Sequence, residues 1–415
     1  MAGQGGSRAA VVGAGIVGLS VAWFMQEAGF EVTVFDARSV AGGASAGNAG
    51  WITPGMVSPL PEPGVVGYAL RSLVRRDSPL RVTPAALPAT ARFLALFAMN
   101  CTRARWQRSV ASLADICALA LSSYDLLERG GVTAELRPSP IVMAFRQAAE
   151  AVPVEHELRV IGEAGIAPDV TELSQRELRE ERPVLSERAR HGLKLDGQRY
   201  LQPLAYTQSL AESFRSRGGQ ITSGARVDRV ASTSGGKLTV ITAGEGTAFD
   251  VAVLASGAWL SRLGKSAGVR PPLAAGRGYS FTVTTATPLA GPLYLPSLRV
   301  ACTPTPGGMR LAGTMEFRSA DAPLDRRRID AIVRSAKDYL DGVDWESISD
   351  VWVGPRPVTA DGLPLIGATK QAGVYVAGGH GMWGMTLGPA TGRLLAEFIA
   401  EGERPAALRH FDPCR

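Results

Sequence analysis

The stretch Val12-Gly13-Ala14-Gly15-Ile16-Val17-Gly18 decides the fold of this 415-residue chain. Residues 8–12 are apolar and predict a strand, residues 16–28 predict a helix, and residues 31–36 alternate as a second strand does. In such a βαβ unit the first glycine permits a tight turn. The second lets the backbone approach a pyrophosphate, and the third lets helix and strand pack closely. Asp36 closes the second strand and is suited to accept ribose hydroxyls, so the stretch predicts a dinucleotide-binding domain.

Three further segments narrow the choice among NAD, NADP and FAD. Asp36 itself argues against the 2′-phosphate of NADP. Residues 42–50 are small and suit an extended pyrophosphate and ribityl chain, and Trp51 and Ile52 offer an apolar wall. Residues 255–259 end an apolar strand with small residues. Residues 378–389 precede the last helix, whose first N–H groups suit the electron-rich edge of a flavin. FAD is therefore the predicted cofactor.

The residues predicted to contact FAD come from the β-strand ends and glycine-rich loops of these segments. They are Gly13, Ala14, Gly15, Ile16, Val17, Gly18, Asp36, Ala37, Arg38, Gly43, Ala44, Ser45, Asn48, Ala49, Gly50, Trp51, Ile52, Val227, Ser256, Gly257, Trp259, Gly381, Met382, Gly384, Met385, Thr386 and Leu387.

Composition excludes several other classes of protein. The chain has 44 Lys and Arg against 38 Asp and Glu, a net charge of +6 without blocks of like charge, which argues against a nucleic-acid partner. Its four cysteines show no CxxC spacing, so no metal site is expected and a reducing compartment is indicated. Residues 1–7 do not suit a signal peptide, and a cytoplasmic location is expected. Glycine and proline interrupt the uncharged runs 39–61 and 371–392, which favours loops around a cofactor over membrane spans.

The α/β pattern returns twice along the chain. Helices are predicted at 84–100, 105–128, 208–217, 325–340 and 389–400, and strands at 221–230, 238–243, 249–255, 279–285 and 373–377. This order predicts an α/β plus α+β fold. A Rossmann-like FAD-binding domain is assembled from residues 1–60, 198–264 and 350–415, and a substrate-binding domain with helices and a mostly antiparallel sheet from residues 61–197 and 265–349.

Motifs spread over nearly the whole chain carry a resemblance to a known family. They are residues 12–18, 43–55, 77–80, 100–102, 354–357 (Gly-Pro-Arg-Pro), 361–364 (Asp-Gly-Leu-Pro) and 379–381 (Gly-His-Gly). In these motifs the chain resembles the D-amino-acid oxidase superfamily, most closely its bacterial D-amino-acid dehydrogenase branch. Residues 382–385 depart from that branch, and residues 387–392 look more like the glycine oxidase ending.

The resemblance implies roles for three side chains. Arg356 lies beside the flavin in the family and grips the substrate carboxylate, for which a planar guanidinium is suited. Tyr279 is a second candidate for substrate contact, with a packed core tyrosine as the alternative. The segment of His380 is expected to touch the flavin through its backbone, so a packing role is favoured over base catalysis.

The expected reaction is oxidative deamination of a D-amino acid to a 2-oxo acid and ammonia, with hydride transfer from Cα to flavin N5. The alternative substrate is a secondary or cyclic amine, or glycine itself, with D-hydroxyproline and sarcosine as further examples. A flavin hydroxylase using NAD(P)H finds no support, and a non-catalytic flavoprotein or a subunit of a larger dehydrogenase is a distant alternative. Either a quinone or oxygen is expected to accept the electrons.

The predicted helical hairpin carries four arginines, at positions 92, 103, 105 and 108. A plain pair of substrate-domain helices is favoured, and the alternative is peripheral contact with the inner face of the cell membrane or with an acceptor protein.

Overall fold

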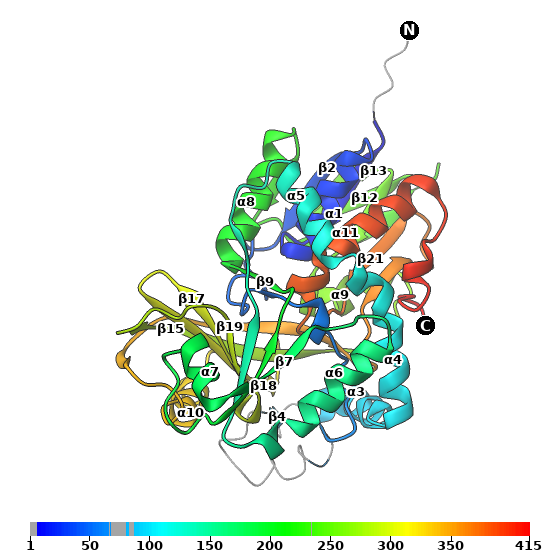
Figure 1. Ribbon diagram of the computed structural model, residues 1–415. Coiled ribbons are helices and arrows are strands. Elements are labelled where there is room, and N and C mark those ends of the chain that lie inside the picture. The colour runs from blue at the N-terminus through cyan, green and yellow to red at the C-terminus, as the bar shows by residue number, and fades with distance from the viewer. Residues whose placement is uncertain (1–5, 66, 68–79, 83–86, 234) are drawn as a thin grey trace.

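The computed structural model describes residues 6–65, 67, 80–82, 87–233 and 235–415, and Figure 1 shows two domains side by side. Positions 77–79 of the family-like motif at 77–80 lie outside these residues. In the described part of the chain the first domain is built on a six-stranded sheet of order β10-β2-β1-β14-β21-β20. Its strands are β10 (Gln220–Ser223), β2 (Glu31–Asp36), β1 (Arg8–Val12), β14 (Val251–Leu254), β21 (Val374–Gly378) and β20 (Leu365–Ala368). The first five strands run parallel, and β20 is antiparallel to β21.

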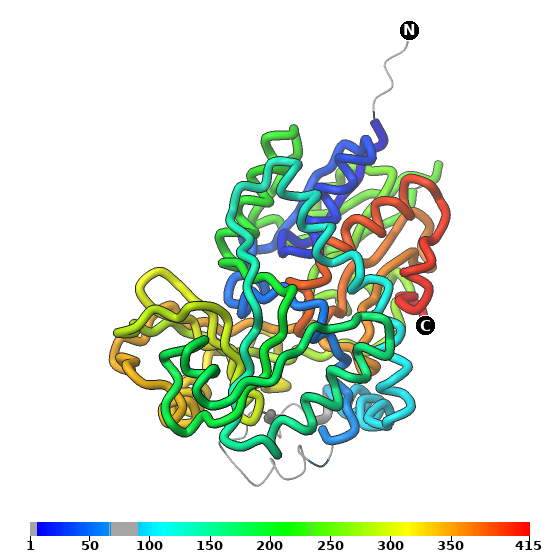
Figure 2. Tube along the Cα trace, viewed as in Figure 1, coloured from blue at the N-terminus to red at the C-terminus, as the bar shows by residue number. Residues whose placement is uncertain are grey.

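Apolar layers cover both faces of this sheet, as a parallel sheet requires. One face packs on α1 (Ile16–Glu27), α8 (Pro203–Ser216) and α11 (Gly384–Glu401). The other packs on α9 (Leu260–Gly264) and a small antiparallel sheet of β11 (Val227–Ser232), β12 (Leu238–Thr242) and β13 (Glu245–Phe249). Figure 2 shows an early and a late segment of the chain side by side here, the blue α1 next to the orange-red α11. The nucleotide domain is thus assembled from segments far apart in sequence.

The second domain is built on a mostly antiparallel sheet of order β19-β15-β18-β17-β16-β6-β8-β7, with β4 (Leu80–Val82) beside β18. The strands are β19 (Val343–Thr359), β15 (Leu273–Thr285), β18 (Gly308–Phe317), β17 (Val300–Thr305), β16 (Leu293–Leu295), β6 (Ile141–Phe145), β8 (His191–Leu195) and β7 (Val170–Ser174). Helices α7 (Gln175–Glu181) and α10 (Arg326–Ala336) bury one face. The other face contacts α6 (Val152–Glu163) and the loop after β2.

The linking elements complete the description. A three-stranded sheet of order β3-β9-β5 joins Trp51–Ile52, Arg199–Leu201 and Leu136–Pro138. Helix α3 (Leu87–Asn100) packs its phenylalanines against the ends of β15, β18 and β19. Single 3-10 turns lie at Pro54–Met56, Ala148–Glu150, Gly257–Trp259, Pro296–Leu298 and Ala406–Leu408.

The predicted helix at 105–128 is two helices, α4 (Arg103–Ala118) and α5 (Ala120–Arg129), which meet at Leu119. Their buried face belongs to the same core as α1 and α11, whereas the sequence assigned residues 61–197 to the substrate domain. Helical periodicity identifies the apolar face of a helix but not its packing partner. Among the described residues, the run 103–129 is the one long and apolar enough to cross a membrane. It is weak evidence for a membrane span, because 44% of its most apolar window is buried inside the protein.

The last helix begins at Gly384, five residues before the predicted start, and contains Pro389. A proline inside a helix lacks the N–H that would bond to the carbonyl four residues earlier, here that of Met385. The hydroxyl of Tyr124 on α5 donates to this carbonyl at 2.6 Å. A tertiary hydrogen bond therefore replaces the missing helical one, and no local pattern could have predicted it.

Two predicted strands are each divided. The stretch 221–230 is split into β10 and β11 by a turn at Gly224, whose φ is 71°. The stretch 249–255 is split between the end of β13 and β14. Helix α8 starts at Pro203, five residues before the prediction, because proline is well tolerated in the first turn.

Candidate active site

A cavity of about 390 Å³ opens at the carboxyl ends of the parallel strands, beside the point between β1 and β14 where the strand order reverses. This is where open α/β sheets bind their ligands, and the volume is within the range of small-molecule sites. The walls come from both domains. They include residues 12, 13, 15–18, 35–38, 42–45, 48, 225–227, 255–259, 262, 263, 321, 355–357, 377, 378, 380–382, 384 and 385.

The glycine loop at one end of the cavity has no room for side chains. A Cβ on Gly13, where φ is 122°, would lie 2.4 Å from the carbonyl oxygen of Ala255, and one on Gly18 would lie 1.9 Å from that of Gly13. Asp36 accepts the N–H groups of Ala14 and Arg38, both at 2.7 Å, so its carboxylate is fixed at the end of β2. This cradle and the fixed acid at the cavity edge fit a dinucleotide.

The loop after β2 lines the cavity with Gly42, Gly43, Ala44, Ser45 and Asn48. The Ser45 hydroxyl also accepts the N–H of Ile16 at 3.0 Å, which ties the loop to the start of α1. The cofactor-facing part of this segment is therefore its first half.

Several residues predicted to touch FAD lie behind the cavity lining instead. Thr303 of β17 donates to the carbonyl of Ala49 at 2.6 Å and accepts the indole N–H of Trp51 at 2.8 Å. Trp51 therefore faces the second sheet. Among the described residues, the predicted FAD contacts that are absent from the cavity wall are Ala14, Ala49, Gly50, Trp51, Ile52, Thr386 and Leu387.

Two side chains of the nucleotide domain meet one of the second domain at the Asp36 end of the cavity. The guanidinium of Arg38 lies over the ring of Trp259, 4.6 Å from its centroid. Asp321, which precedes α10, accepts from Arg38 at 2.9 Å and from the indole N–H of Trp259 at 3.1 Å. We call Arg38, Trp259 and Asp321 the rim cluster. Asp321 could not be predicted from the sequence, because no local pattern connects it to Asp36, 285 residues earlier.

The opposite end of the cavity is formed by the loop before α11, with Gly381, Met382, Gly384 and Met385 on its wall. The N-terminus of α11 is here, so the positive end of its dipole is available to an anionic group. His380 is 4% exposed and shares a 2.9 Å hydrogen bond with the Thr391 hydroxyl through Nε2, while its Nδ1 has no partner among the described residues. Burial lowers the pKa of His380 to about 4, so the imidazole is neutral at physiological pH.

Arg356 of β19 reaches the cavity from the second domain. Its guanidinium lies against Gly278 of β15, where a Cβ would come within 2.3 Å of it. Nη1 donates to the carbonyl of Thr314 at 3.4 Å, and no carboxylate among the described residues forms an ion pair with it. Burial lowers the pKa of Arg356 to about 10, which leaves it charged at neutral pH. A partly exposed cation at the cavity wall, without an anionic partner among the described residues, is suited to an anionic ligand.

Tyr279, the second predicted substrate contact, is absent from the described cavity wall. It is fully buried in the core under α10, and its hydroxyl donates to Glu316 at 2.8 Å. Successive residues of a strand point to opposite faces, so Gly278 and Ser280 face the first domain and Tyr279 faces away from it. The packing alternative describes its position in the structure.

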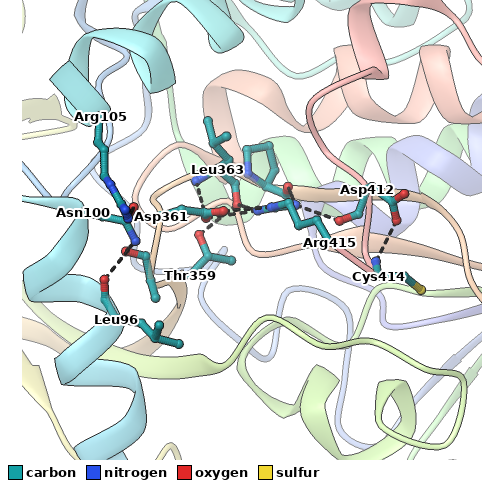
Figure 3. A network of polar contacts seen from close by, with 11 residues as sticks. Leu96, Asn100, Arg105, Thr359, Asp361, Leu363, Asp412, Cys414 and Arg415 are labelled. Carbon is teal, nitrogen blue, oxygen red and sulfur yellow. Dashed lines mark hydrogen bonds and ion pairs between the residues drawn. The ribbon is translucent and has the colours of Figure 1, made fainter.

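The end of β19 is fastened by a polar network that Figure 3 shows from close by. Arg415 binds the carboxylate of Asp361 with two N–H groups, at 2.8 and 3.0 Å, and donates to the carbonyl of Leu363 at 3.0 Å. Asn100 of α3 donates to the carbonyl of Ala360 at 3.2 Å. These contacts hold the turn that follows Arg356 on the same strand.

A nucleotide domain with this cradle, facing a sheet that presents Arg356 to the cavity, defines a two-domain flavin-dependent oxidoreductase. Comparison with known proteins agrees with this class, and the chain belongs to the family of FAD dependent oxidoreductases called DAO, whose sequence model matches residues 8–398. No group of three or more metal-ligating side chains occurs in the part of the chain that the structure describes.

The relatives cover nearly the whole chain. The D-amino acid dehydrogenase of Vibrio vulnificus is 30% identical over 422 residues, which span 97% of this chain and 99% of the relative. Among solved structures, glycine oxidase from Geobacillus kaustophilus has a TM-score of 0.74 at 23% identity, with 99% of both chains covered. Iminodiacetate oxidase from Chelativorans sp. BNC1 has a TM-score of 0.73 at 18% identity, with 98% of this chain and 99% of that chain covered. The two structures share the fold of this chain.

Proposed function

We propose that this enzyme oxidises a D-amino acid to the 2-oxo acid and ammonia, with FAD as its cofactor. The observation that carries the proposal is Arg356, a charged guanidinium that is partly exposed at the cavity wall, without a carboxylate partner in the described chain. The name of the Vibrio vulnificus relative supports the substrate class.

The chain's own residues divide the work between binding and orientation. Arg356 receives the substrate carboxylate bidentately and so fixes which face of the substrate meets the cofactor. Residues 13–18, Asp36 and residues 42–48 would hold FAD, which supplies the two-electron acceptor when bound. His380 pairs its Nε2 with the Thr391 hydroxyl, and burial lowers its pKa and so makes it a weak base; we assign it to positioning the loop. The imine product then hydrolyses to the oxo acid and ammonia.

The test is Arg356→Ala with a panel of D-amino acids, L-amino acids and cyclic imino acids. Loss of a buried charge pair should cost about 2 to 5 kcal/mol of substrate capture, or roughly 30- to 5000-fold in kcat/KM. The readout is anaerobic bleaching of the flavin absorbance, with the FAD content of each variant measured beside it. Arg92→Ala, an exposed arginine of α3, is the control. Unchanged flavin bleaching in Arg356→Ala would contradict the assignment of Arg356 as the residue that binds the substrate carboxylate.

The same panel decides between substrate classes. A guanidinium recognises the carboxylate and is indifferent to substitution on the nitrogen, so secondary or cyclic amines, such as D-hydroxyproline and sarcosine, and glycine are the alternative substrates. The name of iminodiacetate oxidase, whose structure shares the fold of this chain, supports a secondary amine as the alternative substrate. Fast bleaching by any of these compounds would exclude a non-catalytic flavoprotein or an inactive subunit of a larger dehydrogenase.

For the electron acceptor we propose a quinone reached at the cytoplasmic face of the membrane, with oxygen as the alternative. Arg92, Arg103, Arg105 and Arg108 are exposed, and Met99 in the same helical segment is 55% exposed. Cations beside an exposed apolar side chain suit an anionic lipid surface.

Sedimentation with vesicles containing anionic lipid tests this surface. Alanines at the four arginines should abolish co-sedimentation, whereas alanines at the exposed Arg176, Arg179, Arg326 and Arg327 remove the same charge from other surfaces and should not. Equal loss in both variants would indicate nonspecific attraction. Parallel assays of quinone reduction and oxygen consumption identify the acceptor.

A further inference from the structure

A second cavity lies where α4 meets the C-terminal segment of the chain. Its volume is about 530 Å³, and most of the side chains around it are at least partly exposed to solvent. We call it the basic pocket, and it is lined by Asn100, Arg105, Arg108, Ser109, Ala111, Ser112, Leu363, Arg409 and His410. None of these residues belongs to the wall of the cavity that holds Asp36 and Arg356. The basic pocket is therefore a separate site.

Three guanidinium groups line the basic pocket, and none of its described lining residues is acidic. Arg105 and Arg108 come from α4 and Arg409 from the C-terminal segment, and all three are exposed. Like charges around one pocket repel each other, and Arg105 stands in the first turn of α4, at the positive end of the helix dipole. An anion bound among them would offset this repulsion.

The two arginines of α4 have N–H groups available for such an anion. Arg108 donates from Nε to the carbonyl of Ala104 at 3.3 Å, and neither of its Nη groups has a partner among the described residues. Arg105 donates from Nη1 to Oδ1 of Asn100 at 3.3 Å, a contact that Figure 3 shows. Neither arginine forms an ion pair with a carboxylate of the described chain. Both can therefore bind an incoming anion without breaking an existing ion pair.

Arg409 supplies the third cation from the other side of the sequence. Its Nη2 lies 3.6 Å from Oδ2 of Asp115, and its Nε donates to Nε2 of His410 at 2.8 Å. The side chains of Arg409 and Asp115 are 60% and 51% exposed, so this ion pair is weak in water. The hydroxyl of Ser109, on the same face of α4 as Arg105 and Arg108, forms no hydrogen bond with a described residue and is a further donor.

The number and origin of these donors indicate the kind of anion. A planar carboxylate pairs well with a single guanidinium fork, whereas the basic pocket offers three guanidinium groups from two segments of the chain. The oxygens of a phosphate group point in tetrahedral directions and can accept from several arginines at once, and a phosphomonoester carries about two negative charges at neutral pH. The volume leaves room for the rest of a molecule that carries the phosphate.

We propose that the basic pocket binds a phosphate group, supplied either by free phosphate or by the headgroup of an anionic lipid. Arg105, Arg108 and Arg409 bind the phosphate oxygens, and the Ser109 hydroxyl donates a further hydrogen bond. In its lipid form the proposal deepens and rests on the membrane contact proposed above, because Arg105 and Arg108 belong to both. Arg409 belongs to the pocket alone. In its free-phosphate form the proposal does not depend on a membrane.

Three single substitutions in the FAD-loaded full chain separate a pocket from a charged surface. Arg108→Gln changes both the pocket and the four-arginine surface, Arg409→Gln changes the pocket alone, and Arg103→Gln changes the surface alone. The probes are inorganic phosphate, titrated by calorimetry at constant ionic strength, and phosphatidylglycerol vesicles, measured by sedimentation. Loss of a hydrogen bond between charged groups should weaken binding about ten- to hundredfold in Arg108→Gln and Arg409→Gln, and under twofold in Arg103→Gln.

Each probe identifies one source of the phosphate group. Binding of inorganic phosphate that follows this order supports a site for free phosphate. Vesicle binding that follows this order, without binding of inorganic phosphate, supports a lipid headgroup. Equal losses in Arg103→Gln and Arg108→Gln with none in Arg409→Gln would reduce the site to the charge of the surface and overturn the proposal. Wild-type protein that bound neither probe, or that bound acetate as tightly as phosphate, would also overturn it.

Flavin bleaching by D-amino acids, measured on the same proteins, separates this proposal from the proposed function. All three variants should bleach at the wild-type rate, because the basic pocket shares no lining residue with the cavity of Arg356. Wild-type protein that binds phosphate in the expected order but is not bleached would overturn the proposed reaction and keep the pocket. Wild-type protein that binds phosphate but no vesicles would overturn the membrane contact and keep the pocket as well.

Discussion

The two walls of the cavity recognise their ligands by opposite means. The cofactor wall, residues 12–18 and 42–48, offers backbone and small side chains, and most of its members are neighbours in sequence. The substrate wall, built from β15, β18 and β19, offers one long cationic side chain supported by residues more than 40 positions away in the chain. The cofactor can be bound by backbone where side chains are missing. The substrate carboxylate needs a side chain that other residues hold in position.

One glycine in each wall illustrates this difference between recognition by backbone and recognition by a side chain. Gly13 leaves room for backbone, because a Cβ there would meet the Ala255 carbonyl at 2.4 Å. Gly278 leaves room for a side chain, because a Cβ there would meet the end of Arg356 at 2.3 Å. Backbone cannot move without disturbing the sheet, whereas a guanidinium can swing aside. The same substitution should therefore fail in different ways in the two walls.

The largest effect is expected for Gly13→Ala. The substitution combines a φ of 122° with a backbone clash, and should destabilise the fold by about 3 kcal/mol or more and prevent FAD retention. Gly218→Ala is the matched control, since φ is 86° there but no atom lies within 4 Å of the added Cβ. It should cost about 1 to 2 kcal/mol and keep FAD. Urea unfolding and flavin content measure both, and equal losses would show that strain rather than space decides at Gly13.

The next effect concerns His380, at the junction of the two walls. Its pKa falls from 6.5 to about 4 on burial, so the unfolded chain takes up the proton first as pH drops. Stability should therefore decline from about pH 6.5 down to pH 4, and by about 2 kcal/mol between pH 7 and pH 5 from this group. His380→Asn should lose correspondingly less stability over that interval in urea unfolding. An identical pH dependence in the two proteins would mean that the pKa of His380 is the same in the folded and unfolded chain.

The difference between the walls also explains how much of the molecule the sequence predicted. Gly13, Gly18 and Asp36 lie within one βαβ unit, whose spacing specifies the strand, turn and helix together. Arg356 was found by family resemblance and not by its surroundings. Its support from Gly278 and Thr314 depends on strand pairing, which no local pattern specifies.

The contacts of Trp51 and the start of α11 could not be predicted from the sequence for a similar reason. Trp51 is an aromatic residue at the end of a glycine segment, and the sequence does not reveal that Thr303 turns its indole toward the second sheet. The start of α11 was missed because Tyr124, 265 residues before Pro389, compensates for the proline. Both outcomes depend on tertiary hydrogen bonds between remote residues.

A smaller effect on folding is expected for Gly278→Ala, the counterpart of Gly13→Ala. The added methyl group should displace the guanidinium of Arg356, raising KM for the amino acid about tenfold. Stability should change by under about 1 kcal/mol and FAD content should stay unchanged, because a flexible side chain moves instead of the backbone. Steady-state kinetics and flavin content together test this. Loss of FAD in this variant would contradict the separation of the two walls.

The smallest effect is expected at the rim cluster, where the two walls meet through side chains alone. Asp321 is 62% exposed in its side chain and Arg38 is 50% exposed, so their ion pair should contribute under about 1 kcal/mol. Asp321→Ala should speed FAD release by about two- to fivefold in low salt, measured by trapping the released cofactor with an excess of a flavin-binding apoprotein. In 0.5 M salt the wild type and variant should converge, because screening weakens exposed pairs. The exposed Asp330→Ala serves as control. A release rate that is equally raised at both salt concentrations would assign the role of Asp321 to its hydrogen bond with Trp259 instead of its charge, and would make the rim a packed contact between the domains.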